Sequence, residues 1–325
     1  MIDEKEIAIV TKMTKVEYDM KRLKLSYGQL IAFYKREGVN WQRITESNDR
    51  QMAGLEKLKK IFPNARIIKR EELSKEKLKD FKLIISYGGD NHFQYVTHFV
   101  DDQLILGMNS DPKRSEGALT CVSVDYLDDR DNILNEDFKM EDWTRLEVSI
   151  NGKIVDELAA SDIFIGEKVR YQMSRLLIKY KDKNYEQKGS GIVIATGAGS
   201  TGWYRSASRY IKSNNETVSN QDKKFVFIFT EPYSWKLTKM DLTQGEVGES
   251  ETLEVTSLCD FQAIVAIDAL KVVEISEGSK IKVSIGKPLR VVRLKVNFNN
   301  NCIVVTKSKD LKSGVNQASY EKKLE

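Results

Sequence analysis

The sequence contains little cysteine and little histidine, and this limits the metal and redox chemistry open to it. Its three cysteines, Cys121, Cys259 and Cys302, form no CxxC pair, so neither a zinc site nor a disulfide framework is indicated. The two histidines, His92 and His98, are six positions apart and would not share a helix face. No HExxH motif occurs. We therefore expect buried free thiols in a reducing compartment, and metalloprotease chemistry is excluded.

Long apolar runs and a surplus of one charge are also missing. No apolar stretch approaches the roughly 18 residues of a membrane span. The first residues, Met1-Ile2-Asp3-Glu4-Lys5-Glu6, are acidic, unlike a signal or transit peptide. The 52 lysines and arginines are interleaved with 48 acids, whereas a nucleic-acid binder usually has one concentrated basic face. The composition predicts a cytoplasmic enzyme or binding protein that contacts neither membrane nor nucleic acid.

The pattern of the sequence changes near residue 140. Before this point, short apolar runs alternate with charged stretches of helical period, which is typical of βαβ units and predicts a parallel sheet. After it, short β-type runs are separated by turn residues, which is typical of a β-sandwich. The predicted fold is α/β plus all-β. A Rossmann-like α/β domain spans 1–138, a β-sandwich-type domain spans 139–306, and a tail over 307–325 could return to the first domain.

Individual elements follow from the same patterns. In the first part we expect strands at 6–10, 65–68, 83–87 and 104–108, and helices at 15–35 and 48–61. In the second part we expect one helix, at 200–213, and a last helical turn at 320–324. The expected strands of the second part are 145–150, 161–165, 175–180, 191–195, 224–230, 252–258, 262–267 and 280–285.

The predicted strand at 83–87 is followed by two glycines and an acid, Gly88-Gly89-Asp90, and then by a predicted helix start. Ligands of open parallel sheets bind beyond the carboxyl ends of the strands. Two glycines there allow a sharp turn and let a phosphate approach the main chain. A carboxylate at such a turn repels a phosphate unless it binds a metal or takes a proton from a hydroxyl group. Asp90 is equally well explained as a helix N-cap.

The next strand ends in a similar polar segment. Asn109 would lie beside Asp90 if the two strands are neighbours. Lys113 and Arg114 follow and could meet phosphates, although Asp111-Pro112 could simply form a surface turn.

Residues 197–202 match GxGxxG, between a predicted strand and a predicted helix. The following strand reaches its acid only at Glu231, later than the ~20-residue spacing of the dinucleotide fingerprint. A dehydrogenase is therefore weakly supported, but Ser200 and Thr201 suit a pocket lined by hydroxyls and amides. Neither Gly152-Lys153 nor Gly286-Lys287 completes a P-loop.

Taken in order, these segments resemble the NAD kinase family, which carries a GGDGT turn, an Asn-Glu pair and a Thr-Gly-Ser-Thr-Ala-Tyr-like segment. Gly88-Gly89-Asp90 is similar to the first, Ser161-Asp162 to the second, and 196–203 to the third. The segment 109–117 resembles the mitochondrial-type branch in particular. Ile267-Asp268 stands where the family has an Asp-Gly hairpin. The likeness covers roughly residues 83–290.

The resemblance implies that NAD binds between the two domains of a homodimer or homotetramer. Asp90 would be the general base on the adenosine ribose 2′-hydroxyl, and ATP with Mg²⁺ would be the donor, with no metal ligands from the protein. The residues implied to bind NAD are Gly89, Asn109, Ser161, Asp162, Thr196, Gly199, Ser200, Thr201 and Trp203. Those implied to bind donor phosphates are Gly88, Asn91, His92 and Arg114.

Some positions depart from the family pattern. Asn91-His92 replaces the Gly-Thr of the turn, Ser161 replaces the Asn of the pair, and Ala269 replaces the hairpin glycine. These departures leave two alternatives open. One is an NAD(P)-binding protein of the same fold without kinase activity, and the other is a related GGD-type kinase acting on another hydroxyl substrate. The choice between ATP and polyphosphate, and between NAD and NADH, is also open.

Overall fold

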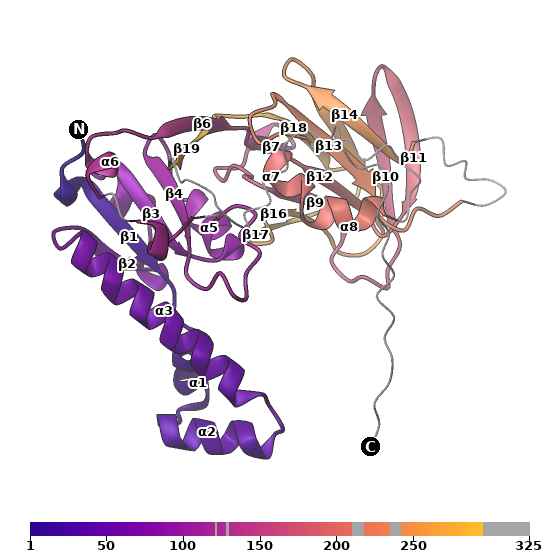
Figure 1. The fold of residues 1–325 in the computed structure, drawn as a ribbon. Coiled ribbons are helices and arrows are strands. Elements are labelled where there is room, and N and C mark those ends of the chain that lie inside the picture. Colours follow the sequence, from indigo (N-terminus) through magenta and orange to yellow (C-terminus); the bar gives the residue numbers. More distant parts are fainter. Residues whose placement is uncertain (121, 128–129, 210–217, 235–241, 295–325) are drawn as a thin grey trace, which may run out of the picture. The chain divides into compact units, whose positions relative to one another are not determined.

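The computed structural model describes residues 1–120, 122–127, 130–209, 218–234 and 242–294. The predicted tail at 307–325, with its expected helical turn at 320–324, lies outside the described residues. Met1–Lys295 form one compact unit, in which the described residues build three sheets (Figure 1).

A mostly parallel sheet contains the four strands predicted for the first part. Its strand order is β2-β1-β3-β4-β19-β6, with β5 beside β4. Ile7 and Ile9 of β1 pack in one apolar core, while Ala8 and Val10 pack in another on the opposite face. Both faces are therefore covered, which explains the continuous apolar runs of the strands. The strands are β1 (Ile7–Thr11), β2 (Arg66–Lys69), β3 (Leu83–Gly88), β4 (Leu104–Asn109), β5 (Val122–Ser123), β6 (Lys139–Trp143) and β19 (Leu289–Arg293).

Helices cover this sheet on its two faces. Leu58 of α3 and Ile133 of α6 join the core that contains Ile7, and Leu78 of α4 and Phe93 of α5 join the core that contains Ala8. No helix among the described residues is long and apolar enough to cross a membrane. The elements are α3 (Trp41–Ile61), α4 (Lys75–Leu78), α5 (Asp90–Thr97), α6 (Arg130–Leu134), η1 (Glu4–Glu6), η2 (Arg70–Glu72) and η3 (Val124–Tyr126).

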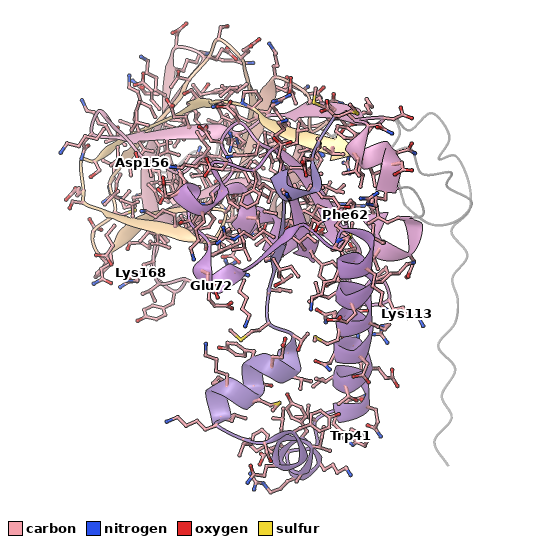
Figure 2. The ribbon with its side chains drawn as sticks, turned by 90° about the vertical axis from the view of Figure 1, so that its left-hand side faces the viewer. Trp41, Phe62, Glu72, Lys113, Asp156 and Lys168 are labelled. Atoms are coloured by element: carbon pink, nitrogen blue, oxygen red, sulfur yellow. The ribbon has the colours of Figure 1, made fainter. Side chains whose placement is uncertain are left out.

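The single helix predicted at 15–35 is wrong, because the chain forms two helices, α1 (Lys15–Leu23) and α2 (Tyr27–Arg36). Lys24 ends α1 in the left-handed conformation, with φ of 55°. Ser26 then caps α2 in a capping box. Asn40 caps α3, so that helix begins earlier than predicted. Figure 2 labels Trp41 and Phe62 at the two ends of α3.

The second part is a sandwich of two antiparallel six-stranded sheets, as predicted. Leu146 and Leu253 of one sheet and Ile163 and Val265 of the other share one core. The first sheet contains β7 (Leu146–Ile150), β8 (Lys153–Ile154), β10 (Ser174–Tyr180), β11 (Lys183–Gly189), β15 (Leu253–Ser257) and β18 (Lys280–Ile285). The second contains β9 (Asp162–Glu167), β12 (Ile192–Ala195), β13 (Lys224–Phe229), β14 (Gln244–Gly248), β16 (Ala263–Ile267) and β17 (Lys271–Ile275).

The helix predicted at 200–213 is two short pieces, α7 (Gly197–Ser200) and α8 (Trp203–Ser208). Its last residues lie outside the described part of the chain.

Two strands that were not predicted, β6 and β19, fall in the range 139–306 given to the second domain but pair in the first sheet. β19 pairs with β4 and with β6, and its apolar residues Leu289, Val291 and Val292 are buried. The chain thus returns to the parallel sheet at β19, earlier than the predicted tail. Buried Arg145 stabilises this position of the chain, because its guanidinium donates to the carbonyls of Val100, Lys287 and Pro288.

Candidate functional site

The GGD turn lies at the carboxyl edge of the parallel sheet, where sheet topology predicts a ligand. Gly88 is the last residue of β3 and pairs with Asn109, the last residue of β4. A Cβ on Gly88 would lie 2.5 Å from the His92 ring, so only glycine fits there. Gly89 precedes α5, and Asp90 is the first residue of that helix. The sheet register therefore brings Asn109 next to the turn that carries Asp90.

The Asp90 carboxylate holds the loop that follows β4. Oδ1 accepts hydrogen bonds from the Leu119 amide (3.1 Å), the Thr120 amide (3.1 Å) and the Thr120 hydroxyl (2.9 Å). Oδ2 accepts one, from the Ala118 amide at 3.0 Å. The N-cap interpretation of Asp90 is wrong, because Gly89 occupies the cap position and makes no side-chain cap bond. A carboxylate oxygen has about two acceptor sites, so Oδ2 keeps accepting capacity toward a ligand within the described structure.

Asn109 organises the same loop from the next strand. Its Nδ2 donates to the Ser115 carbonyl (3.3 Å), and its Oδ1 accepts from the Asp111 amide (3.0 Å). Asp111 is buried and pairs with Arg50 of α3 at 2.9 Å, so it is not part of a simple surface turn. The exposed Arg114 donates to the Arg43 carbonyl on α3 at 3.2 Å. The loop is thus fixed between α3 and the GGD turn.

His92 does not lie where a donor phosphate could reach it. Its side chain has 0% exposure, and its Nε2 is 3.1 Å from the Val10 carbonyl oxygen. Burial lowers the pKa of His92 to about 4, so the ring is neutral at physiological pH and Nε2–H donates to Val10. The predicted phosphate contact of His92 is therefore wrong in this structure, because the ring packs under Gly88. Its neighbour Asn91 is exposed.

A buried acid, Asp268, organises the Ser161–Asp162 segment. Its Oδ1 accepts from the amides of Ser161 (2.8 Å) and Asp162 (2.9 Å), and its Oδ2 accepts from the Ala160 amide (2.8 Å). His98 Nε2 lies 3.0 Å from the same Oδ2. Because His98 is the C-cap of α5, the helix that begins at Asp90 ends on the carboxylate that fixes the Ser161–Asp162 segment.

Asp162 has an unusual electrostatic environment. Burial, and then the charge of Asp268, raise the pKa of Asp162 to about 6. The Ser161 hydroxyl donates to Asp162 Oδ2 at 3.3 Å and opposes that shift. A partly buried carboxylate that ionises near pH 6 can accept hydrogen bonds from the hydroxyl groups of a ligand at neutral pH.

The segment 196–203 contains a buried half and an exposed half. The Thr196 hydroxyl donates to the Ala160 carbonyl (2.7 Å), and the Ser200 hydroxyl donates to the Gly197 carbonyl (2.7 Å). A Cβ on Gly199 would lie 2.1 Å from the Ser161 carbonyl oxygen. Thr196 and Gly199 therefore hold the segment against Ala160 and Ser161. The predicted direct contacts of Thr196, Gly199 and Ser200 with NAD are not supported, because all three residues are buried and the two hydroxyls are engaged.

Thr201 and Trp203 form the exposed half of the segment. The Trp203 ring is 38% exposed and stacks on Phe164, with centroids 5.3 Å apart and an interplanar angle of 20°. One face of the indole is therefore supported, which prepares it for a further planar group.

The candidate site is distinct from a cavity of about 310 Å³ at the opposite edge of the sheet, which is lined by Lys82 and Leu104 among others. These residues mark the amino ends of β3 and β4, whereas Asp90 and Asn109 mark the carboxyl ends. The edge with the turn carries the chemically informative side chains.

Known proteins share both sequence and fold with this chain, although no family model matches it. Human mitochondrial NAD kinase 2 is 24% identical over 271 residues, covering 67% of this chain and 61% of that protein. An NAD kinase of Campylobacter jejuni is 26% identical over 217 residues, covering 64% of this chain and 67% of that protein. The chain is thus similar in sequence to NAD kinases over about two thirds of its length. It spans less than two thirds of the length of the human relative.

Solved structures of the family share the fold. An NAD kinase from Archaeoglobus fulgidus in complex with ATP superposes with a TM-score of 0.59 at 20% identity, covering 89% of this chain and 94% of that one. Yeast NADH kinase complexed with NADH gives a TM-score of 0.65 at 13% identity, covering 90% and 84%.

The sequence did not assign a role in the site to three residues that help to build it. Asp268 and Ala269 have φ of 49° and 53°, so the hairpin keeps its left-handed turn without the family's glycine. Asp268 could have been found from the sequence, because it is the acid of this turn. Thr120 and His98 gave no signal, because their roles arise only from tertiary contacts.

Proposed function

We propose that this protein phosphorylates the adenosine ribose 2′-hydroxyl of NAD to give NADP, with ATP as donor and Asp90 as general base. The observation that carries the proposal is the Asp90 carboxylate at the sheet edge, with Oδ1 saturated by three donors and Oδ2 accepting only one. The names of the relatives support the choice of substrates.

The proton transfer follows from this arrangement. Asp90 Oδ2 accepts the 2′-hydroxyl proton as that oxygen forms a bond to the terminal phosphorus, and the bond from phosphorus to the departing ADP oxygen breaks. The proton then leaves Asp90 for solvent. The amides of Leu119 and Thr120 keep the carboxylate in one orientation, which lowers the entropic cost of reaching the transition state.

NAD would be held by groups that reach the surface of the site. Asp162 offers an acceptor to ribose hydroxyls, and Trp203 offers a supported aromatic face to a planar ring. Gly89 and Thr201 complete this proposed set. Ser161 and Asn109 are buried with their side chains engaged, so they are proposed to position the site rather than to contact NAD. Asp268 acts indirectly by fixing the 160–162 backbone.

Magnesium is proposed to arrive with the donor rather than to occupy a protein site. The described residues contain no group of three or more His, Cys, Asp or Glu side chains arranged around a metal position. Mg²⁺ commonly binds through substrate phosphates with few protein ligands, and it would neutralise charge on the transferring group.

An NAD(P)-binding protein without kinase activity is the second candidate. The burial of His92 favours it, because that position was expected to assist the donor phosphates. The predicted cytoplasmic location and homo-oligomeric state stay predictions.

A donor and acceptor panel tests the proposal. The purified protein is incubated with NAD, NADH or sphingosine as acceptor and with ATP or polyphosphate as donor, with Mg²⁺. NADP is followed by a coupled dehydrogenase, and labelled ATP reports transfer to the other acceptors. We expect NADP from NAD and ATP. Calorimetric binding of NAD with no product from any donor would establish the second candidate, and label on sphingosine alone would establish a kinase of another hydroxyl.

A further inference from the structure

Two cations, Lys12 and Arg70, lie at the same edge of the parallel sheet as the GGD turn. Thr11, the last residue of β1, pairs with Lys69 of β2 and with Tyr87 of β3. The next residue on each of these three strands is Lys12, Arg70 and Gly88, respectively. Adjacent strands are about 4.8 Å apart, so the three positions form a continuous row along the carboxyl edge of the sheet.

Contacts with α5 confirm this placement. The Arg70 guanidinium lies 3.8 Å from the centroid of the Tyr95 ring, on the helix that begins at Asp90. Lys12 and Arg70 both contribute to lowering the pKa of His92, whose ring packs under Gly88. Both cations are therefore close to the turn. Figure 2 labels Glu72, the last residue of η2, two positions beyond Arg70.

Neither cation is neutralised by an acid within the described parts of the chain. Glu72, two positions beyond Arg70, faces Lys77 at 3.9 Å. The described ion pairs include neither Lys12 nor Arg70, although many other surface cations are paired. Partial burial, and then the charge of Arg70, lower the pKa of Lys12. Two cations that repel each other, with no carboxylate between them, favour an anion at the same place.

We propose that Lys12 and Arg70 bind the phosphate chain of the nucleoside triphosphate donor. This inference rests on the proposed kinase function and assigns to these two residues the role that His92 cannot perform. An ammonium group and a planar guanidinium are the side chains that bind phosphates most strongly. They lie on the β1 side of Gly88, while Asn109 lies on the β4 side, so donor and NAD would approach Asp90 from opposite sides.

The test compares Lys12→Gln and Arg70→Gln with Lys82→Gln. Lys82 precedes β3 at the opposite edge of the same sheet, so its variant carries the same change in net charge. For the two site variants we expect the KM for ATP, and the calorimetric Kd for MgATP and for inorganic tripolyphosphate, to rise at least about tenfold. The Kd for NAD should change less than twofold. Lys82→Gln should match the wild type in all four measurements.

The outcomes separate this inference from the proposed function. If the wild type forms no NADP, the kinase proposal fails, but the MgATP and tripolyphosphate titrations still decide the role of the two cations. Unchanged binding in Lys12→Gln, or no binding of either probe to the wild type, overturns the inference. Lys12 lies at the surface although its side chain is partly covered, so Lys12→Gln should fold, and it decides alone if Arg70→Gln is unstable. Arg70→Lys, which keeps the charge, should recover most of the affinity.

Discussion

The side chains of Asp90 and His92 have different surroundings, although the two residues are only two positions apart in α5. A helix turns about 100° per residue, so positions i and i+2 point in nearly opposite directions. Asp90 points to the loop at 118–120, where it meets four donors. His92 points into the sheet, where its ring meets the Val10 carbonyl. One residue is thus available for chemistry, while the other supports the glycine turn from below.

The neutral, buried His92 predicts a loss of stability in acid. The pKa of His92 is about 4 in the folded protein and about 6.5 when exposed, so the unfolded state binds the proton more readily. Stability is therefore complete above pH 6.5 and falls as the pH drops from about 6.5 to about 4. Between pH 7.5 and pH 4.5 we expect protonation of His92 in the unfolded state to lower the free energy of unfolding by about 2–3 kcal/mol, as measured by urea denaturation.

The variant His92→Gln isolates this effect, because the titration of the carboxylates is common to both proteins. The wild type should lose about 2–3 kcal/mol more than His92→Gln between the two pH values. His98→Gln keeps His92 and should retain the wild-type loss. An equal loss in the wild type and in His92→Gln would show that the ring is not held neutral in the fold.

At the scale of elements, close backbone approaches connect the segments of the site. α7 packs so tightly on the start of β9 that a Cβ on Gly199 would lie 2.1 Å from the Ser161 carbonyl oxygen and 2.6 Å from its carbonyl carbon. Thr196 reinforces the approach by donating to the Ala160 carbonyl. This packing sets the position of Ser161 and Asp162.

Gly199→Ala should therefore separate α7 from β9. Because the clash is with backbone, we expect the free energy of unfolding to fall by about 2–3 kcal/mol and NAD binding to weaken more than tenfold by calorimetry. Gly28→Ala adds the same methyl group in α2, where no atom lies within 4 Å, and should be neutral or stabilising by up to about 1 kcal/mol. Wild-type NAD affinity in a folded Gly199→Ala would contradict the positioning role of this contact.

The sequence predicted the elements that have strong periodic patterns. The buried strands β1, β3 and β4 and eight of the twelve described sandwich strands were predicted, because alternation and apolar runs indicate burial directly. The sandwich strands β8, β11, β14 and β17 were not predicted. The break between α1 and α2 was missed, because a lysine rather than a glycine adopts the left-handed cap at residue 24. β19 was not predicted as a strand, and its residues fell in the range 139–306 given to the second domain, because only its pairing with β4 and β6 places it in the first sheet.

Within the site, the sequence predicted which residues lie together better than it predicted where their side chains point. It brought Asn109 beside Asp90 through the order of the strands, and it identified Asp90 as a polar residue at a ligand-binding edge. The sequence did not predict that the hydroxyls of Thr196 and Ser200 donate to main-chain carbonyls. It also did not predict that Asp268 accepts hydrogen bonds from the amides of 160–162. Asp268 is 107 residues from Ser161 and Thr196 is 36 residues from Ala160, so these two contacts arise only from the tertiary structure.

For the molecule as a whole, α5 connects the proposed base with the segment proposed to hold NAD. It begins with Asp90, and its C-cap His98 contacts Asp268, which holds the Ser161–Asp162 segment. Arg145 adds a second link by joining the Val100 carbonyl to those of Lys287 and Pro288. The base and the proposed NAD contacts are therefore connected through α5 within one compact unit.

The rate of NADP formation by Asp90→Asn tests the central claim most directly. The amide keeps the size of the carboxylate but cannot accept the 2′-hydroxyl proton. We therefore expect kcat with NAD and ATP to fall at least about a hundredfold, with the Kd for NAD within about threefold of the wild type. Asp80→Asn, an exposed acid at the opposite edge of the same sheet, serves as the matched control. A kcat of Asp90→Asn within threefold of the wild type would contradict the assignment of Asp90 as the base.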